Sequence, residues 1–354
     1  MLPLGAKIGI LGGGQLGRML SVAASRLGFK CHVYEPSENP PAGDTSAMLT
    51  TASYEDTGAL KQFAQSVDIV TFEFENVPVE ALDFIEPIVK ISPSRHALQI
   101  SQDRLIEKEF LNDLGLETAP YFKVDNRVEL TNALEKIQSP SILKTRKFGY
   151  DGKGQVKIES KEDVVGAIES FTGSDFILEG VVNFSKEISV IAARNSNGQI
   201  ACFDPGENIH INGILDTTVV PCKLPRPIIT DAILLTSSIL EALNYVGVLG
   251  VELFVIKNKL IVNEIAPRVH NSGHWTQDGC IVDQFEQHIR AISGWSLGDG
   301  SRFVNVTMKN LIGNDILAIS QLMQEPNTAI HLYGKEEIRP NRKMGHVNHL
   351  SKKT

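Results

Sequence analysis

Cysteine is scarce in this sequence, and its four cysteines (Cys31, Cys202, Cys222 and Cys280) form no CxxC pair. This absence argues against a zinc or dithiol motif, so we expect reduced thiols packed in the core. No apolar run reaches 18 residues, so no membrane-spanning helix is expected. The N-terminus lacks a charged segment followed by a long apolar run, so we expect no signal peptide and a cytoplasmic location.

An excess of positive charge is also missing. The formal net charge of -8 argues against a general binder of nucleic acids or membrane surfaces. The chain has no internal repeats and no low-complexity tract. Its 354 residues, 42% of them hydrophobic, suffice for two or three ordinary globular domains.

The first part of the chain alternates between strand and helix patterns. We predict strands at 7–11, 30–35 and 68–72, and helices at 15–27 and 56–66. Such alternation is typical of right-handed βαβ units with a parallel sheet. A boundary is expected at 92–95, where serine and proline cluster.

The pattern changes after this boundary from parallel α/β to α+β. A charged amphipathic helix is predicted at 102–112, and another helix at about 230–245. Strands are predicted at 120–124, 141–145, 176–179 and 187–193, and these are expected to be antiparallel. The end of the chain, from about residue 303, is expected to hold short strands and turns.

Two glutamates face each other across a predicted hairpin. With Asn258 at the tip of the turn, the cross-strand pairs are Glu252–Glu264, Phe254–Val262 and Ile256–Leu260. Opposed carboxylates about 5 Å apart repel by roughly 3 kcal/mol at an effective dielectric constant near 20. A divalent cation would reverse this effect, and oxygen ligands favour Mg²⁺. The residues alone leave open a metal site, two solvated glutamates or a shifted register.

Two glycine-rich loops are candidates for phosphate binding. Residues 12–17 match GxGxxG between a strand and a helix, and Glu35 ends the next strand. This loop favours a dinucleotide, a sugar phosphate or only tight strand–helix packing. The second loop, 149–155, lies between strands and lacks the P-loop pattern, so we interpret it as a phosphate-covering flap with Lys144 nearby, or as a plain turn.

Other polar segments are ambiguous when taken alone. Residues 179–182 follow an apolar strand and could form an adenine-binding hinge, with Glu187 near the ribose. Residues 266–275 contain Arg268, whose fork geometry suits a phosphate or carboxylate. Residues 335–346 form a basic cluster. Each segment could equally be surface structure, and the absence of HExxH argues against a zinc protease.

Taken together, these motifs resemble the N5-carboxyaminoimidazole ribonucleotide synthases, the ATP-grasp carboxylases of de novo purine biosynthesis. The matching segments, in family order, are GGGQLGRML (12–20), TFEFENVP (71–78), GYDGKGQ (149–155), NEIAPRVHNSGHW (263–275) and RPNRKMGH (339–346). The resemblance implies a three-domain architecture that mixes α/β and α+β. A Rossmann-like domain (1–100) would precede an ATP-grasp domain of two lobes (101–295) and a small C-terminal domain (296–354).

The resemblance also implies the site residues. Those expected at ATP are Arg104, Lys144, Gly149, Tyr150, Asp151, Gly152, Lys153, Gly154, Gln155, Glu179, Gly180, Val181, Val182, Glu187, His210, Asn263 and Glu264. Those expected at the ribonucleotide are Gln15, Glu73, Tyr150, Asp151, Arg268, Asn271, Arg342 and Lys343. Glu252 and Glu264 would hold Mg²⁺, with Mn²⁺ as an alternative ion.

The implied reaction joins ATP, bicarbonate and 5-aminoimidazole ribonucleotide, by way of carboxyphosphate, in a homodimeric ligase that binds neither nucleic acid nor membrane. Arg268 is expected to act on carboxyphosphate, and Asp151 and Lys343 on the amine. The alternatives are a formate-dependent glycinamide ribonucleotide formyltransferase, an NAD-dependent dehydrogenase and a nucleotide-binding regulatory protein.

Two positions depart from the family pattern. Phe148, preceded by the extra base Lys147, stands where a second flap glycine is common. Ala266 stands where many ATP-grasp enzymes carry an asparagine two residues after the second metal glutamate, so we expect Asn263 to be a substitute ligand.

Overall fold

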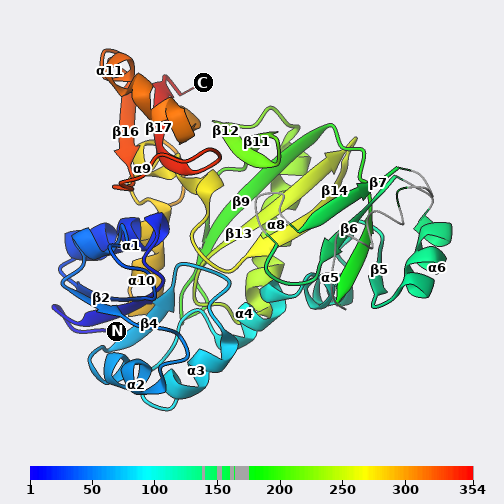
Figure 1. Cartoon of the computed structure of the whole chain (residues 1–354). Coiled ribbons are helices and arrows are strands. Elements are labelled where there is room, and N and C mark those ends of the chain that lie inside the picture. Colours follow the sequence, from blue (N-terminus) through cyan, green and yellow to red (C-terminus); the bar gives the residue numbers. More distant parts are fainter. Residues whose placement is uncertain (138–139, 150–153, 160–162, 164–174, 354) are drawn as a thin grey trace.

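A computed structural model describes residues 1–137, 140–149, 154–159, 163 and 175–353 of the chain. The N-terminal region forms a parallel sheet in the order β3-β2-β1-β4, as the alternating pattern predicts (Figure 1). Its elements are β1 (Lys7–Leu11), α1 (Gln15–Arg26), β2 (Lys30–Glu35), the 3-10 helix η1 (Gly43–Thr45), β3 (Met48–Thr51), α2 (Thr57–Gln65), β4 (Ile69–Phe72) and α3 (Val79–Ile85). The carboxyl ends of β1 and β4 lie side by side, so the loops that follow them meet at one edge of the sheet.

Two helices, not one, connect this sheet to the rest of the molecule. They are α4 (Arg95–Gln102) and α5 (Arg104–Asp113), and the break lies at Asp103, whose backbone is extended. The Asp103 carboxylate accepts a hydrogen bond from the backbone N–H of Leu105, with an N···O distance of 3.0 Å. The same carboxylate accepts two hydrogen bonds from Arg146, at 2.9 and 2.6 Å. The predicted helix at 102–112 is therefore wrong at its start, because Asp103 is the cap of a new helix.

A small antiparallel sheet follows, in the order β5-β8-β6-β7. Its strands are β5 (Tyr121–Val124), β6 (Ser141–Thr145), β7 (Gln155–Ile158) and β8 (Phe176–Gly180), and the helix α6 (Arg127–Ile137) connects β5 to β6. Leu130, Leu143 and Leu178 belong to its own hydrophobic core. The predicted flap therefore connects two paired strands, β6 and β7.

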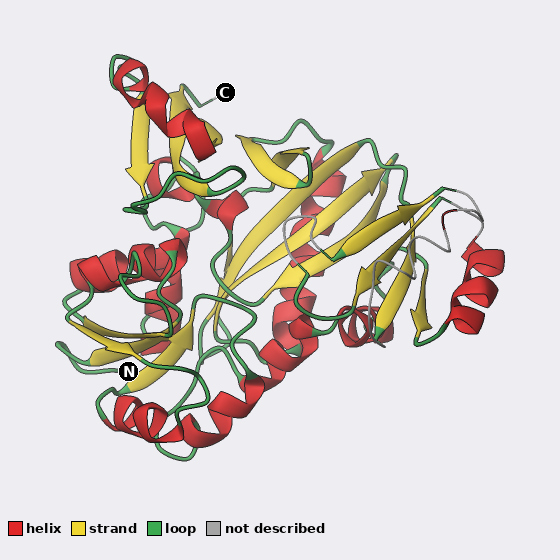
Figure 2. Ribbon diagram, in the orientation of Figure 1, coloured by secondary structure: helices red, strands yellow, loops and turns green. Residues whose placement is uncertain are grey.

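The largest sheet runs from the Glu252/Glu264 hairpin into the C-terminal region (Figure 2). Its order is β14-β13-β9-β11-β12-β15-β17-β16, with β10 paired to β9. The elements are β9 (Lys186–Arg194), β10 (Ile200–Cys202), β11 (Gly206–Ile211), β12 (Ile214–Val220), α8 (Arg226–Ala242), β13 (Gly247–Ile256), β14 (Lys259–Ala266), η2 (Asn271–Gly273), α9 (Thr276–Gly279), α10 (Gln284–Ser293), β15 (Asn305–Ile312), η3 (Gly313–Ala318), α11 (Ile319–Leu322), β16 (Thr328–Leu332) and β17 (Lys343–Ser351).

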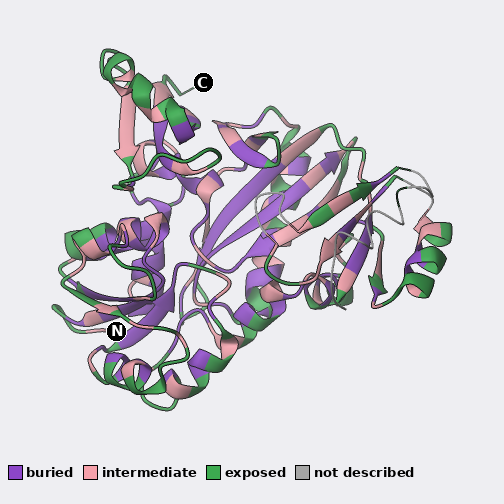
Figure 3. Ribbon diagram, viewed as in Figure 1, coloured by how far each residue is buried: buried purple, intermediate pink, exposed green. Residues whose placement is uncertain are grey.

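Two predictions for this region need adjustment. Helix α8 begins at Arg226 and not near residue 230, because Pro227 fits the first turn of a helix. The C-terminal strands β15 and β17 have 8 and 9 residues, so they are longer than expected. Because β15 pairs with β12, the end of the chain extends the large sheet. Residues 188–193 of β9 and 247–253 of β13 are buried (Figure 3).

No helix in the described part of the chain is both long and apolar enough to cross a membrane.

The Asp103 cap should contribute strongly to stability. We expect Asp103→Ala to lower the free energy of unfolding by about 3 kcal/mol, because it removes a cap and the closer of the two carboxylates that pair with the mostly buried Arg146, which leaves only Asp175 at 3.7 Å. Chemical denaturation measures the effect. Asp56→Ala is the matched control, since Asp56 caps α2 through Ala59 at an exposed site and should cost about 1 kcal/mol. Equal losses in both variants would contradict the structural role of the Asp103–Arg146 contact.

Candidate active site

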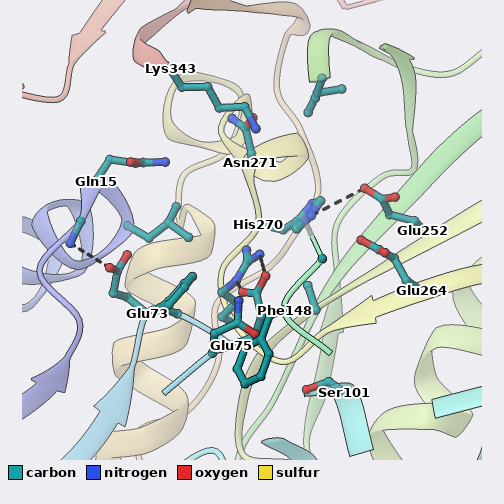
Figure 4. A pocket seen from close by; sticks show the side chains of 18 of the residues that line it. Gln15, Glu73, Glu75, Ser101, Phe148, Glu252, Glu264, His270, Asn271 and Lys343 are labelled. Carbon is teal, nitrogen blue, oxygen red and sulfur yellow. Dashed lines mark hydrogen bonds and ion pairs between the residues drawn. The ribbon is translucent and has the colours of Figure 1, made fainter. Parts of the chain in front are cut away.

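A cavity of about 970 Å³ lies where the three parts of the chain meet (Figure 4). The loops after β1 and β4 form one wall, the small and large sheets form two more, and the start of β17 closes the side near the C-terminus. The predicted site residues that line it are Gln15, Glu73, Arg104, Lys144, Gly149, Gln155, Glu187, His210, Glu252, Asn263, Glu264, Arg268, Asn271, Arg342 and Lys343. Residues far apart in sequence are thus brought to one space.

Not every predicted residue is placed there. Gly154, Glu179, Gly180, Val181 and Val182 do not line the cavity, although Glu179 contacts Lys144, which does. Tyr150, Asp151, Gly152 and Lys153 lie outside the described residues.

The Glu252/Glu264 pair exists, but the rest of the predicted hairpin register is wrong. The turn has two residues, Lys257 and Asn258, rather than three. The observed pairs near the turn are Ile256–Lys259, Val255–Leu260, Phe254–Ile261 and Leu253–Val262. A β-bulge next to Glu252 then shifts the register by one residue and restores the Glu252–Glu264 pair. Asn263 is the extra residue, and its amide Nδ2 donates to Glu252 at 3.3 Å.

The hairpin carboxylates lie in a strongly negative environment. Burial raises the pKa of Glu252 well above its usual value, and Glu264 and Glu187 add to this effect. Glu107 on α5 is also buried, and burial followed by the charge of Glu264 raises its pKa to about 8. The described cationic contact to Glu264 is Arg104, with Nη1 3.5 Å from Oε2.

The donor set here fits a divalent cation. Carboxylate and amide oxygens from Glu252, Glu264 and Asn263 are the ligands that hard cations prefer. Glu187, His210 and Glu252 form a second group, with one ligand atom of each within 4.8 Å of the others. Figure 4 shows His270 facing Glu252, and the Nε2–Oε1 distance is 3.6 Å. A bound cation would relieve the repulsion that burial intensifies.

Across the cavity, a buried glutamate holds two lysines. Glu179 Oε2 lies 2.9 Å from Nζ of Lys144 and 3.5 Å from Nζ of Lys108. Burial alone would raise the pKa of Glu179, but the two lysines hold it below its usual value. Burial lowers the pKa of Lys144. Glu179 therefore holds the Lys144 amine on the cavity wall, with the Lys108 amine behind it.

The N-terminal glycine loop is already occupied by carboxylates of the same chain. Gly14 N–H and Gly17 N–H donate to Glu73 at 2.8 and 3.1 Å, and Gly13 N–H donates to Glu35 at 2.7 Å. A β-carbon at Gly14 would lie 2.8 Å from Glu73 Oε1, so a side chain at this position would displace the Glu73 carboxylate. The amides that would bind a dinucleotide phosphate are thus engaged, which argues against the dehydrogenase alternative.

Arg268 is also engaged by a residue that the sequence did not single out. Its Nε and Nη2 both donate to the carboxylate of Glu75, and the Nη2–Oε1 distance is 2.9 Å. Burial would raise the pKa of Glu75, but Arg268 holds it below its usual value.

The amide of Asn271 exchanges two hydrogen bonds with that of Asn310, at 2.9 and 2.8 Å.

Aromatic side chains form the remaining wall. The rings of Phe184 and Phe254 stack with centroids 4.4 Å apart and an interplanar angle of 7°. Phe148 has a φ of +63°, a conformation that favours glycine, and its side chain is largely exposed beside the cavity. The departure from a glycine at this position is therefore a strained one.

Sequence reasoning missed Glu75, Glu107, Lys108, Phe184 and Phe254. The sequence pattern gave little indication of their roles. Glu107 and Lys108, for example, lie in a charged helix whose pattern is typical of a solvent-exposed helix. Glu75 does lie within the TFEFENVP segment, two residues after Glu73, so this segment held the one usable signal.

Comparison with known proteins yields three family models that together match most of the chain. They are a ribonucleotide synthetase preATP-grasp domain (residues 5–102), an ATP-grasp domain (109–285) and a phosphoribosylaminoimidazole carboxylase C-terminal domain (306–354). ATP-grasp domains bind ATP and use a divalent metal ion.

Individual relatives are similar to this chain over nearly its whole length. An N5-carboxyaminoimidazole ribonucleotide synthase from Brucella melitensis is 46% identical over 353 residues, which cover 99% of this chain and 98% of the relative. The ADP complex of an N5-carboxyaminoimidazole ribonucleotide synthetase has a TM-score of 0.96 at 40% identity, covering 99% of this chain and 94% of the other. The Aspergillus clavatus enzyme, solved with ADP and 5-aminoimidazole ribonucleotide, has a TM-score of 0.92 at 31% identity, covering 98% and 94%.

The buried carboxylates give the metal-free protein a testable pH dependence. A carboxyl group whose pKa is raised by folding favours the folded state below its unfolded pKa, and this contribution is lost as the pH rises through the folded pKa. Glu107 titrates near pH 8, and the pKa of Glu252 moves in the same direction. Buried histidines whose pKa is lowered, among them His270, His274 and His346, have the opposite effect up to about pH 6.5. Metal-free protein should therefore lose stability between about pH 7 and pH 8, as thermal unfolding in chelator will show.

Glu252→Gln should make metal-free protein more stable at pH 8 by about 1–3 kcal/mol, because glutamine carries no charge opposite Glu264 and does not need the proton that burial makes Glu252 retain. Glu241→Gln is the control, since it removes a negative charge from an exposed position on α8. A loss of stability in Glu252→Gln at pH 8 would contradict the repulsion.

Proposed function

The chain belongs to the N5-carboxyaminoimidazole ribonucleotide synthase family, and on that premise we propose that it carboxylates 5-aminoimidazole ribonucleotide with ATP and bicarbonate. One observation carries the proposal. One cavity is lined by the Glu252/Glu264 pair, of which Glu252 is buried and Glu264 partly exposed, by cationic residues such as Lys144 and Arg268, and by the loops of the N-terminal sheet. A nucleotide triphosphate, a divalent cation and an anionic second substrate can therefore meet there.

ATP would occupy the side between the small and large sheets. Lys144 and Arg104 offer positive charge to the phosphates, and the Phe184/Phe254 stack offers an apolar face to adenine. Glu187, linked to His210 at 3.1 Å, is placed for ribose hydroxyls. The remaining expected contacts are Glu179, Gly180, Val181, Val182, Asn263 and the loop from Gly149 to Gln155, whose middle lies outside the described residues.

Mg²⁺ would be held by Glu252 and Glu264, with Asn263 at the bulge beside them. When bound, the ion would neutralise charge that develops on the transferred phosphoryl group. The protein residues then have three further tasks: to hold the nucleotide, to exclude water and to orient the second substrate.

The reaction would proceed in two steps. An oxygen of bicarbonate forms a bond to the γ-phosphorus as the bond to ADP breaks, which gives carboxyphosphate. The substrate amine then forms a C–N bond to the carboxyl carbon as the C–O bond to phosphate breaks, and the amine releases a proton. Arg268 would orient carboxyphosphate, and Lys343 and Asp151 would position the amine or handle its proton.

The ribonucleotide would lie on the N-terminal side of the cavity. Figure 4 shows Gln15, Glu73, Asn271 and Lys343 around this space. Arg342 lines the same side, and Tyr150 is expected there by resemblance. A homodimer is the assembly that the family resemblance favours.

Substrate choice tests the proposal directly. We expect ADP release to require bicarbonate together with 5-aminoimidazole ribonucleotide, measured by a coupled ADP assay. The parallel reaction contains formate and glycinamide ribonucleotide, the substrates of the rival formyltransferase. Release of ADP with the formate pair alone would overturn the proposal.

Glu264→Gln should lower ATP turnover by about 100-fold or more, since it removes one charged metal ligand from the site of phosphoryl transfer. Circular dichroism and thermal unfolding should show a folded protein. The control is Glu117→Gln, because Glu117 contacts Lys259 of the same hairpin but is exposed and outside the cavity. Full turnover by the Glu264 variant would exclude the carboxylate pair from the metal site.

Asp151→Asn tests the role proposed for the amine. Turnover in the presence of the ribonucleotide should fall, because an amide cannot take up the proton of the amine, and the coupled ADP assay measures the fall. Unchanged turnover would remove Asp151 from the mechanism.

A further inference from the structure

Glu75 forms a two-point contact with the arginine on which the proposed reaction depends. It lies in the loop between β4 and α3, whereas Arg268 follows β14. Nε and Nη2 of Arg268 both donate to Glu75, and Nη1 donates to the backbone carbonyl of Val269 at 3.1 Å. The plane of the guanidinium group is thereby fixed from two sides.

The loop that carries Glu75 is itself held in place. The side-chain amide of Gln102, at the end of α4, donates to the carbonyl oxygens of Glu75 and Val77 at 2.8 and 2.7 Å. Glu73, two residues earlier, is bonded to the glycine loop. Glu75 is therefore a fixed support and not a surface side chain that reaches Arg268 by chance.

The contact leaves Arg268 with donors to spare. An arginine has five N–H donors, and contacts within the described part of the chain engage three of them, so one on Nη1 and one on Nη2 have no partner among those residues. Both residues line the cavity, with 16% and 24% of their side chains exposed. Separating the pair would leave a mostly buried carboxylate near Glu73, at high cost. The pair should thus persist when a ligand binds.

We propose that Glu75 is a positioning residue that holds Arg268 with its two remaining N–H donors toward carboxyphosphate. This inference rests on the proposed function. Carboxyphosphate that is not held is lost to water, and its hydrolysis returns bicarbonate and phosphate. Without Glu75, ATP should still be consumed, but fewer turnovers should end in carboxylation.

The test measures ADP and carboxylated product in the same reaction. In Glu75→Ala, the ratio of product to ADP should fall by about 10-fold, because the orientation of Arg268 is lost. The KM for ATP should stay within about twofold, since the side chain of Glu75 contacts Arg268 and, among the described residues, none of those assigned to the nucleotide. Glu75→Gln has the same shape and keeps one acceptor, so its ratio should be intermediate; it also decides the question if the alanine variant fails to fold.

Arg26→Ala is the matched control. Arg26 also bridges the N-terminal region and a later helix, through Asp283 and Glu286 at 3.2 and 3.3 Å, but it lies outside the cavity. Its product ratio should equal that of the wild type. An equal fall in Arg26→Ala would mean that Glu75 only connects two regions of the chain, which would overturn the inference. An unchanged ratio in both Glu75 variants would also overturn it. Failure of the wild-type protein to form product would instead refute the proposed function.

Discussion

The burial of like charges is the constraint on which the rest of the cavity depends. Glu252, Glu264 and Glu107 are crowded near the β13–β14 hairpin, and no nearby described residue except Arg104 contacts Glu264 with a positive charge. Such an arrangement costs free energy in an empty site, and proteins retain it where a bound cation supplies the missing charge. The neighbouring elements follow from this requirement: α5 brings Arg104 and Glu107 to the hairpin, and the bulge brings Asn263 to Glu252.

A second kind of compensation operates on the N-terminal side. There the carboxylates of Glu35, Glu73 and Glu75 are each paired within the protein, with glycine amides or with Arg268. The two sides therefore differ in chemistry: one has charge to be satisfied by a ligand, and the other is already satisfied and rigid. Arg268, which Glu75 holds in place, offers preorganised donors that need little rearrangement when charge develops in a reaction.

Sequence patterns predicted much of this arrangement, and the misses have physical reasons. The parallel sheet was confirmed because the alternation of strands and helices is a local property. The Glu252–Glu264 pair was also confirmed, although the bulge, and not the predicted register, brings these two residues opposite each other. The hairpin register was wrong elsewhere, because a bulge and a shorter turn compensate each other and leave no trace in the pattern. The break at Asp103 was missed because the residue that binds the Asp103 carboxylate, Arg146, lies in another part of the chain. Glu75 and Lys108 were missed for the same reason. Their contacts, with Arg268 and Glu179 respectively, join residues that are far apart in the sequence. The roles assigned to individual site residues remain predictions.

The pairing of β12 with β15 means that the C-terminal strands are not an appendage. A chain shortened before β15 would leave the long β12 with one unpaired edge, and exposed strand edges recruit other chains into aggregates. It would also lose Lys343 and Arg342, which close one side of the cavity. Engineering of this enzyme by truncation or by exchange of its last segment would thus disturb solubility and catalysis together. Fusion partners are better attached after β17, where the chain leaves the sheet.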